Sequence, residues 1–484
     1  MSHKTSYKFA LGLLPLLGLL AGCSSNSTAA DGNTVVFWST GSQGMNNTLT
    51  ALAKKFTAVM KEKTGVDVKV ELSVEGSYDD IATKLSKGLS IGNVPTMAVA
   101  YPDTVANLIA SEPAPESYVY NIDSYMNDAE IGFTKQPFLG DTSDATKEDI
   151  VPSFLKEGSS YSREGTYSYP FMKSSEVMFY NRDNLEKAYR FYKPEINTIS
   201  DMERDLKSLS WDEFMDLCKV VSEHKAQILS TLETPLWYDS DSNLFITQMY
   251  QRGIPYSSIE ADGKGKIDFE SGENRTEAEN MVKALKAERD AGLITTKGIE
   301  NSYGSDAFKT GKVLFSVGSS GGTGYNMPSD VTPDKIGVCK VPAAKKNPLY
   351  VSQGPTITFI KNPSLSDEIN TSRSRLAWQF AKFLTNPDNN VRLCIEGSEG
   401  YLPIRYSAYD TEAYASYLEE GEIYAASARV LIDEINGRYY NSPVFPGSAQ
   451  LRDQVGTIIT TVLKDGKDIK TAFDTAITTT KTAM

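Results

Sequence analysis

Strands and helices alternate in the first part of this chain, and the alternation is the strongest constraint on its fold. Residues 34–38 form a short apolar run, residues 45–63 carry apolar side chains at helical spacing, and residues 66–74 alternate as a strand does. Ser77 is a typical N-cap for a second helix, and residues 96–100 form a third apolar run. Strands joined by helices predict a parallel sheet with right-handed crossovers. We therefore expect an α/β fold.

Aromatic and polar side chains follow the ends of these strands. Trp38 ends the first strand, Tyr78 opens the helix after the second, and Tyr101 and Asp103 follow the third. Ligands of such sheets bind beyond the carboxyl ends of the strands, which predicts a binding site here. Aromatic rings can stack on the apolar face of a sugar while polar groups bind its hydroxyls. The alternative is that these rings only seal the end of the core.

A second candidate stretch is residues 166–185, TYSYPFMKSSEVMFYNRDNL. Tyr169 precedes Pro170 and is therefore restricted to extended conformations. Residues 177–180 are a continuous apolar run, as in a buried parallel strand, and a small polar patch that includes Ser174 leads into them. The stretch lies between two α/β patterns, so we interpret it as a crossing between two lobes with a ligand site beside it. An ordinary strand entry is the alternative.

The N-terminal segment has the features of a bacterial lipoprotein leader. Residues 1–22 combine a positively charged start with an apolar segment, 9–21, that is too short to span a bilayer comfortably. Leu-Ala-Gly before Cys23 resembles the lipobox, in which the cysteine becomes the lipidated first residue after cleavage. Residues 23–33 would then be a lipidated cysteine followed by a small polar tether. A plain secretory cleavage with Cys23 incidental is the alternative.

Charge narrows the range of partners. The 484 residues carry a formal net charge of −13. This disfavours nucleic acids and anionic lipid surfaces as partners. The length allows two domains with sizeable cores.

Histidine and cysteine are scarce. His3 belongs to the leader, so His224 alone remains, which disfavours zinc hydrolysis and a Ser-His-Asp triad. Cys218, Cys339 and Cys394 have no metal-binding spacing, and we expect them to be small buried apolar residues. A disulfide between Cys218 and Cys394 is left open. No cofactor and no metal site are expected.

Further candidates lie in the second half of the chain. Trp237 is either a stacking platform or a core residue. Asp239, Asp241 and Asn243 have the spacing that begins a calcium loop, but the glycine and glutamate that complete such a loop are absent, so calcium is not expected.

Two small polar turns add to these candidates. The glycine-rich segment 318–324 lacks the Gly-Lys-Ser/Thr ending of a nucleotide-binding loop, although its backbone could approach another polar ligand. Gln353 and Gly354 form a second small polar turn that leads into a strand.

Eight motifs in order resemble the extracellular solute-binding proteins of ABC importers, the family-1 group that includes maltose-binding and glycerol-3-phosphate-binding proteins. The matching segments are 36–38, 76–80, 92–95, 169–181, 210–214, 308–315, 377–387 and 400–405.

The resemblance implies a two-lobed fold of the periplasmic-binding-protein type II, each lobe a mostly parallel sheet flanked by helices, with a ligand cleft between the lobes. By analogy, one lobe comprises residues 34–167 and 317–363, and the other comprises residues 168–316 and 364–484.

The resemblance also implies ligand-binding positions at Tyr78, Ser174, Ser320, Gly354 and Tyr401. Two departures disfavour glycerol phosphate. Pro102 separates Tyr101 from Asp103 where that branch has a Glu directly after the Tyr, and the Gly-Leu-Arg-Leu segment with its phosphate-binding arginine has no counterpart, because Arg452 matches a different position. A carbohydrate is therefore the favoured ligand, with glycerol 3-phosphate or a phosphodiester as the alternative.

Together these features predict a lipid-anchored, monomeric substrate-binding subunit that is not an enzyme and delivers a sugar to a membrane permease coupled to an ATPase. The predicted ligand contacts are stacking by Trp38, Tyr78, Tyr101, Trp237 and Tyr401, and hydrogen bonds from Asp103, Ser174, Ser320, Gln353 and Arg405, with the backbone of Gly354 beside them. The competing classes are a secreted glycoside hydrolase, which would need two carboxylates across one cleft, and an anchored adhesin or chaperone.

Overall fold

The computed structural model describes residues 31–344, 348–397 and 400–484. The predicted leader, Cys23 and most of the tether lie outside these residues. Gly32–Met484 forms one compact unit. Among the described residues, none of the helices combines the length and hydrophobicity that crossing a membrane requires.

The first sheet contains the predicted β-α-β-α-β unit. Its strand order is β2-β1-β3-β13-β4, and β1 is parallel to both β2 and β3. The strands are β1 (Thr34–Ser39), β2 (Lys69–Val74), β3 (Met97–Ala100), β13 (Thr356–Phe359) and β4 (Ser168–Pro170). The second connecting helix, α2, begins as expected at Ser77, which forms a capping box with Asp80, and Gly65 with φ 74° caps the end of α1.

The second sheet has the order β11-β5-β10-β6-β9. Its strands are β11 (Ile336–Lys340), β5 (Glu176–Asn181), β10 (Val313–Ser319), β6 (Thr234–Tyr238) and β9 (Ile294–Thr296). The predicted crossing stretch is confirmed, since β4 lies in the first sheet and β5 lies in the second, with only residues 171–175 between them.

Both sheets are mostly parallel, as expected, because four of the five strands in each run in the same direction. In the first sheet β13 is antiparallel to β3 and β4, and in the second sheet β5 is antiparallel to β10 and β11. Only β13 and β5 run against the other strands of their sheets, because each follows a segment that crosses over from the other sheet, whereas β4 and β11 run with the β-α-β strands.

The sheets also divide the chain differently from the expected lobe boundaries. Residues 336–340 were expected with the first sheet, but they pair with β5 in the second. Residues 367–384 were expected with the second lobe, but α14 (Asp367–Leu384) packs on β1 and β13 of the first sheet. Both differences have one cause. After β11 the chain returns to the first sheet only at β13, and it stays beside that sheet through α14.

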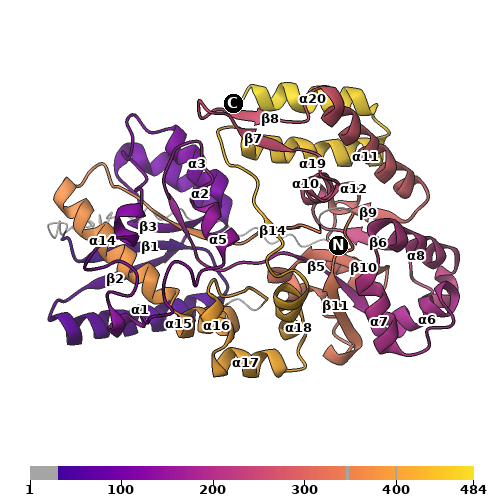
Figure 1. The fold of residues 1–484 in the computed structure, drawn as a ribbon, viewed down its shortest axis with the longest axis horizontal. Helices are drawn as coiled ribbons and strands as arrows, with labels where there is room; N and C mark the ends of the chain where they lie inside the picture. The colour runs from indigo at the N-terminus through magenta and orange to yellow at the C-terminus, as the bar shows by residue number, and fades with distance from the viewer. Residues whose placement is uncertain (1–30, 345–347, 398–399) are drawn as a thin grey trace, which may run out of the picture. The chain divides into compact units, whose positions relative to one another are not determined.

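Helices flank both sheets (Figure 1). Those around the first sheet include α1 (Gln43–Thr64), α2 (Tyr78–Gly88), α3 (Pro102–Ala110), α5 (Pro152–Glu157), α14 and α15 (Pro387–Arg392). Those around the second include α6 (Arg182–Tyr192), α7 (Ile199–Ser208), α8 (Trp211–Glu223), α10 (Asp241–Arg252), α11 (Gly272–Asp290), α12 (Lys297–Glu300), α13 (Gly304–Lys309), α19 (Ser448–Asp465) and α20 (Ile469–Lys481). Shorter elements are α4 (Asp123–Met126), α9 (Lys225–Ile228), α16 (Tyr406–Tyr409), α17 (Glu412–Glu419), α18 (Ile423–Arg429), β7 (Ser257–Ile259), β8 (Gly265–Ile267), β12 (Tyr350–Val351) and β14 (Tyr439–Tyr440).

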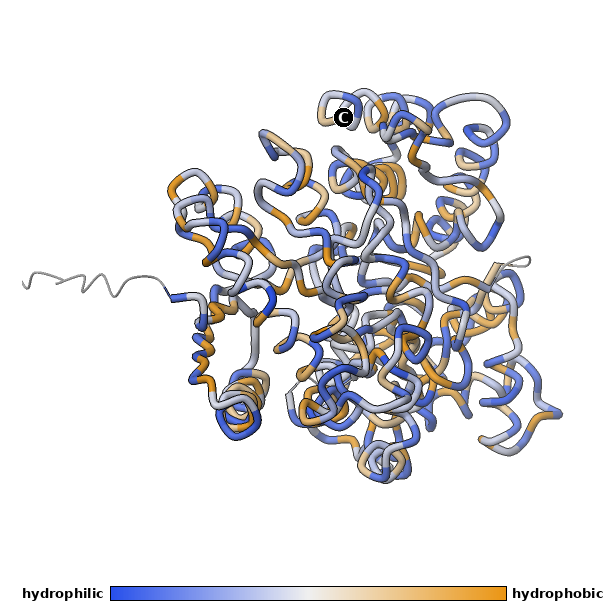
Figure 2. Tube along the Cα trace, turned by 60° about the vertical axis from the view of Figure 1, so that its left-hand side comes forward, coloured by the Kyte–Doolittle hydropathy of each residue, from blue (hydrophilic) through white to orange (hydrophobic). Residues whose placement is uncertain are grey.

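The buried apolar residues form two hydrophobic cores, of which the first contains residues of the first sheet and also Phe179 and Trp237 of the second sheet. Phe37, Phe56 and Phe380 pack together beneath the first sheet, and Phe214 and Phe315 pack beneath the second. Figure 2 shows hydrophobic and hydrophilic residues alternating along the helical segments, as expected for helices with one buried face.

The three cysteines beyond the leader are buried free thiols. Cys218 and Cys339 belong to the second core, and Cys394 belongs to the first. The interpretation of these residues as small buried apolar groups is confirmed, and Cys218 and Cys394 form no disulfide.

Candidate binding site

A cavity of about 370 Å³ is lined by segments that are far apart in the sequence. They are the start of α3, the end of α5, the segment after β14 and the first turns of α19, together with two segments that cross between the sheets. These crossing segments are residues 171–175 and residues 348–355, which lead into β13. Residues in its walls include Tyr101, Asp103, Glu157, Ser174, Tyr256, Ser319, Ser352, Gln353, Gly354, Tyr401, Tyr440, Asn441, Ser448 and Arg452.

Six of the residues predicted from the sequence line this cavity. They are Tyr101, Asp103, Ser174, Gln353, Gly354 and Tyr401. Two others lie beside it. The Tyr78 ring packs against that of Tyr101 at a centroid distance of 4.4 Å, and the buried Ser320 hydroxyl accepts a hydrogen bond from the backbone of Ser175 at 3.4 Å.

The other three predicted residues do not line the cavity. Trp38 and Trp237 are buried in the first hydrophobic core, and Trp237 donates its indole N–H to the Ser302 carbonyl at 3.3 Å. Arg405 is only 1% exposed and donates to the Thr385 carbonyl at 2.9 Å, with Asp149 at 3.5 Å. All three are core residues, and the polar atoms of Trp237 and Arg405 are bonded to the protein around them.

A buried ion pair forms part of the wall, and sequence reasoning missed its carboxylate. Lys173 Nζ donates to Glu157 Oε2 and, at 3.3 Å, to the Gly354 carbonyl. Lys173 is fully buried, while Glu157 is 5% exposed and lines the cavity. Burial raises the pKa of Glu157, and the neighbouring ammonium opposes that shift. Glu157 lies in the weakly patterned region 111–165, so no local pattern marked it.

Several buried polar atoms at the cavity have no hydrogen-bond partner among the described residues. They are Tyr256 OH, Ser352 Oγ, Gln353 Oε1 and Asn441 Oδ1. A buried polar atom without a partner costs about 1–3 kcal/mol. Their convergence on one cavity therefore indicates a site for a polar molecule with several hydrogen-bonding groups.

One cation faces this cavity among its lining residues. Arg452 Nη2 donates to Asn243 Oδ1, and Asn243 Nδ2 donates to Glu176 Oε1 at 2.8 Å. Tyr238 completes the chain by donating its hydroxyl to Glu176 Oε2 at 2.5 Å. Burial raises the pKa of Glu176 to about 7, and the two hydrogen bonds oppose the shift.

A second cavity, of about 400 Å³, lies elsewhere on the second sheet's helices. Trp211, Arg252, Ile254 and Asn280 are among its lining residues, and none of the predicted site residues lines it.

The chain belongs to the bacterial extracellular solute-binding protein family, whose model matches residues 51–419. The family consists of binding proteins that act outside the cytoplasm. No curated protein sequence matches the chain.

Solved structures of two-lobed solute-binding proteins share the fold. The GacH receptor of Streptomyces glaucescens, solved unliganded and with acarbose, is 18% identical, covers 93% of this chain and 97% of its own, and has a TM-score of 0.61. UgpB from Mycobacterium tuberculosis, in complex with glycerophosphocholine, is 18% identical, covers 93% and 98%, and has a TM-score of 0.64. Maltose-bound MalE3 of T. maritima is 14% identical, covers 93% and 100%, and has a TM-score of 0.62.

Proposed function

We propose that this protein captures a carbohydrate in the cavity of about 370 Å³ and delivers it to the membrane permease of an ABC importer. The observation that carries this proposal is the group of unpartnered polar atoms on one cavity wall, together with the tyrosines Tyr101, Tyr256, Tyr401 and Tyr440. The family and the sugar-binding proteins that share the fold support it.

A sugar matches both parts of this wall. Its hydroxyls can donate to the amide oxygens of Gln353 and Asn441 and can pair with the Tyr256 hydroxyl, which have no partner among the described residues. Its apolar face can stack on tyrosine rings, as in other largely aromatic pockets with a few fixed polar groups. Trp38, Trp237 and Arg405, which were expected to contact the ligand, have no part in this proposal.

The proposal includes a hinged closure of the two lobes, because the residues that line the cavity come from elements around both sheets. Tyr101 and Asp103 start α3, which follows a strand of the first sheet, whereas Ser448 and Arg452 belong to α19, which packs on α10 and α11 around the second. Ser174 and Gln353 lie in the two crossing segments. A ligand that contacts all of these groups would stabilise the closed arrangement and shift the population towards it. In this account the lobes bend about residues 171–175 and 348–355.

The remaining elements of the proposal concern location and partners. Cys23 would carry the lipid that anchors the protein outside the membrane, with residues 24–33 as the tether. The protein would act as a monomer without catalytic activity, and its partner would be the transmembrane subunits of the importer with their ATPase.

The experiment that tests the proposed function is a thermal-shift screen of the compact unit Gly32–Met484 against mono-, di- and oligosaccharides. A ligand at a hundred times its dissociation constant should stabilise the fold by about 2.7 kcal/mol. The substitution Gln353→Ala should weaken a hit, whereas Asn280→Ala at the second cavity should not. Absence of any saccharide hit would contradict the carbohydrate proposal, and hydrolysis of the hit would contradict the proposal that the protein only binds it.

A further inference from the structure

We propose that the cavity contains an oxyanion subsite at the start of α19, beside Arg452, and that the ligand therefore carries a carboxylate or a phosphate as well as hydroxyls. This inference rests on the proposed function and narrows its ligand class.

The first turns of α19 open onto the cavity. Ser448, Ala449, Leu451 and Arg452 all line it. The helix has 18 residues, its N-cap is Gly447 with no side-chain cap, and no acidic residue lies in its first turn. The Ser448 N–H donates to the Phe445 carbonyl at 2.9 Å and the Leu451 N–H donates to the Gly447 carbonyl at 2.8 Å, which leaves the N–H groups of Ala449 and Gln450 for a ligand. The helix dipole places partial positive charge at this end. Such an end favours an anion.

Arg452 adds a full positive charge to the same turns. Of the residues that the structure describes, it is the only lysine or arginine that lines the cavity. Among the described residues, its one hydrogen-bond partner is Asn243, so most of its five N–H donors remain available. A guanidinium presents these donors in a planar fork that matches carboxylate and phosphate oxygens.

A buried chain of hydrogen bonds fixes the orientation of this guanidinium. Asn243 is 2% exposed and Glu176 is 4% exposed, and each is bonded to the next residue in the chain. Because the amide of Asn243 donates to Glu176, its oxygen is left to accept from Arg452. Arg452 is thus held by groups that cannot rotate freely, which lowers the entropic cost of binding an anion.

An independent polar group points to a ligand at the same cavity. Tyr256 is 4% exposed and lines the cavity, and its hydroxyl has no partner among the described residues. Burial raises the pKa of Tyr256, so the hydroxyl keeps its proton and can donate to an anion.

The carboxylates that also line the cavity are compatible with this arrangement. The charge of Glu157 is met by Lys173. Asp103 comes from α3, on the side of the first sheet, where it can accept from hydroxyls of the ligand. The cavity therefore offers donors at α19 and acceptors at α3, as a hydroxylated acid requires.

The test uses matched probe pairs that differ only in the anionic group. Isothermal titration of Gly32–Met484 would compare D-glucuronate with D-glucose, glycerol 3-phosphate with glycerol, and the uronate or phosphate form of any saccharide hit with its neutral form. We expect an acidic member to bind at least about tenfold more tightly than its neutral counterpart, since charge-assisted hydrogen bonds are stronger than hydrogen bonds between neutral groups. The uronate and phosphate arms distinguish the two oxyanions.

Variants then assign the preference to Arg452. Arg452→Gln should abolish the difference between acidic and neutral probes, and Arg452→Lys should restore part of it. Arg252→Gln, at the second cavity, should leave it unchanged.

Each outcome decides between the two proposals. Neutral sugars that bind as tightly as their acidic forms would overturn the oxyanion subsite and leave the proposed function in place. Tight binding of acids that survives Arg452→Gln would also overturn it. If no probe in any pair binds, both the subsite and the carbohydrate proposal are wrong.

Discussion

Two buried lysine–carboxylate pairs, Lys382–Asp141 and Lys173–Glu157, show how the same chemistry can serve the scaffold in one place and a ligand in another. All four side chains are almost completely buried. The pairs differ in what surrounds their remaining polar atoms.

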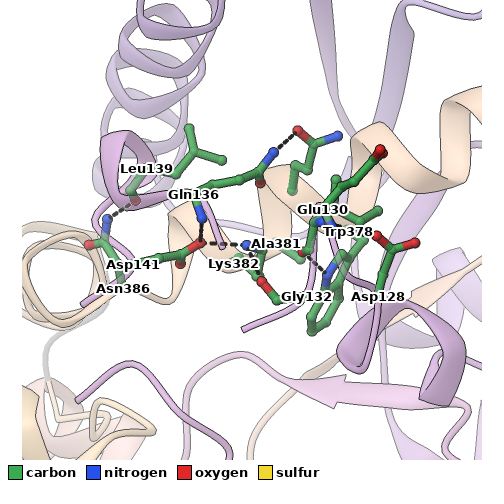
Figure 3. A network of polar contacts seen from close by, with 12 residues as sticks. Asp128, Glu130, Gly132, Gln136, Leu139, Asp141, Trp378, Ala381, Lys382 and Asn386 are labelled. Atoms are coloured by element: carbon green, nitrogen blue, oxygen red, sulfur yellow. Dashed lines mark hydrogen bonds and ion pairs between the residues drawn. The ribbon is translucent and has the colours of Figure 1, made fainter. Parts of the chain in front are cut away.

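The Lys382–Asp141 pair is enclosed by the protein (Figure 3). Lys382 Nζ lies 2.5 Å from Asp141 Oδ2 and donates to the Gly132 carbonyl at 3.0 Å. The same carboxylate oxygen accepts from the backbone N–H of Gln136 at 3.2 Å. The pair thereby ties the segment 132–141 to α14, and it does not line the cavity.

The Lys173–Glu157 pair is enclosed on one side only. Lys173 is bonded to Glu157 and to the Gly354 carbonyl, but Glu157 lines the cavity. A buried charge is costly unless it is fully hydrogen-bonded. The comparison therefore indicates that a buried charge whose partners all come from the protein is structural, whereas one that faces a cavity is available to a ligand.

The largest expected effect is on the enclosed pair. Lys382→Met leaves the Asp141 carboxylate buried without its cation, and breaking a buried pair in this way typically costs about 3–5 kcal/mol. Urea denaturation would measure the loss in free energy of unfolding. The matched control is Lys309→Met, which removes the exposed pair with Asp306 and should cost less than about 1 kcal/mol. Equal losses in the two variants would refute the structural role of Lys382.

The second effect is on binding by the pair at the cavity. Glu157→Gln keeps an acceptor for Lys173 but removes a carboxylate from the cavity wall, so the dissociation constant for a saccharide hit should rise about tenfold or more if the ligand binds there. Asp141→Asn should lower stability and leave that constant unchanged in the folded protein. Isothermal titration of both variants distinguishes the two roles. A Glu157→Gln variant with unaltered affinity would place this pair in the scaffold too.

A third buried carboxylate, that of Glu176, extends the comparison to the pH dependence of stability. Among the residues described in the structure, no cation is bonded to Glu176, and the titratable or charged groups near it are Tyr238, Asp239, Tyr440 and Arg452. Its pKa is raised by burial from 4.5 to about 7. The folded state therefore binds more protons than the unfolded state between these values, and stability should fall as pH rises through this window.

The expected contribution of Glu176 is of order 1 kcal/mol, and thermal unfolding from pH 5 to pH 8 would measure it. Glu176→Gln should flatten this part of the profile. Glu288→Gln is the comparison variant. Burial raises the pKa of Glu288 to about 7 as well, but Glu288 does not line the cavity. A profile that Glu176→Gln leaves unchanged would contradict the assignment.

The sequence predicted local structure well where a pattern is complete within one segment. Alternating apolar runs predicted the first β-α-β unit, and Ser77 was correctly predicted as the N-cap of α2. Tyr169-Pro170 and the apolar run after it predicted the crossing from one sheet to the other. These patterns can be read from one segment because the hydrogen bonds of helices and turns, and the periodicity of side chains, relate residues that are close in the sequence.

The site was only partly predictable, because its residues converge from distant segments. Tyr101, Ser174 and Gly354 were found through strand ends and turns, whereas Glu157, Tyr256 and Asn441 lie in segments without any such pattern. Conversely, Trp38 and Trp237 are aromatic residues of the kind that stack on sugars, but both are packed in the first hydrophobic core. The local sequence does not predict whether a side chain at the end of a buried strand points into the core or into a cavity.

The most direct measurement is a crystal structure of Gly32–Met484 with the tightest-binding saccharide from the screen. The account predicts that the ligand occupies the cavity of about 370 Å³, within hydrogen-bond distance of Tyr256, Gln353 and Asn441. A ligand bound in the cavity at Trp211, or on the outer surface with those three groups untouched, would contradict it.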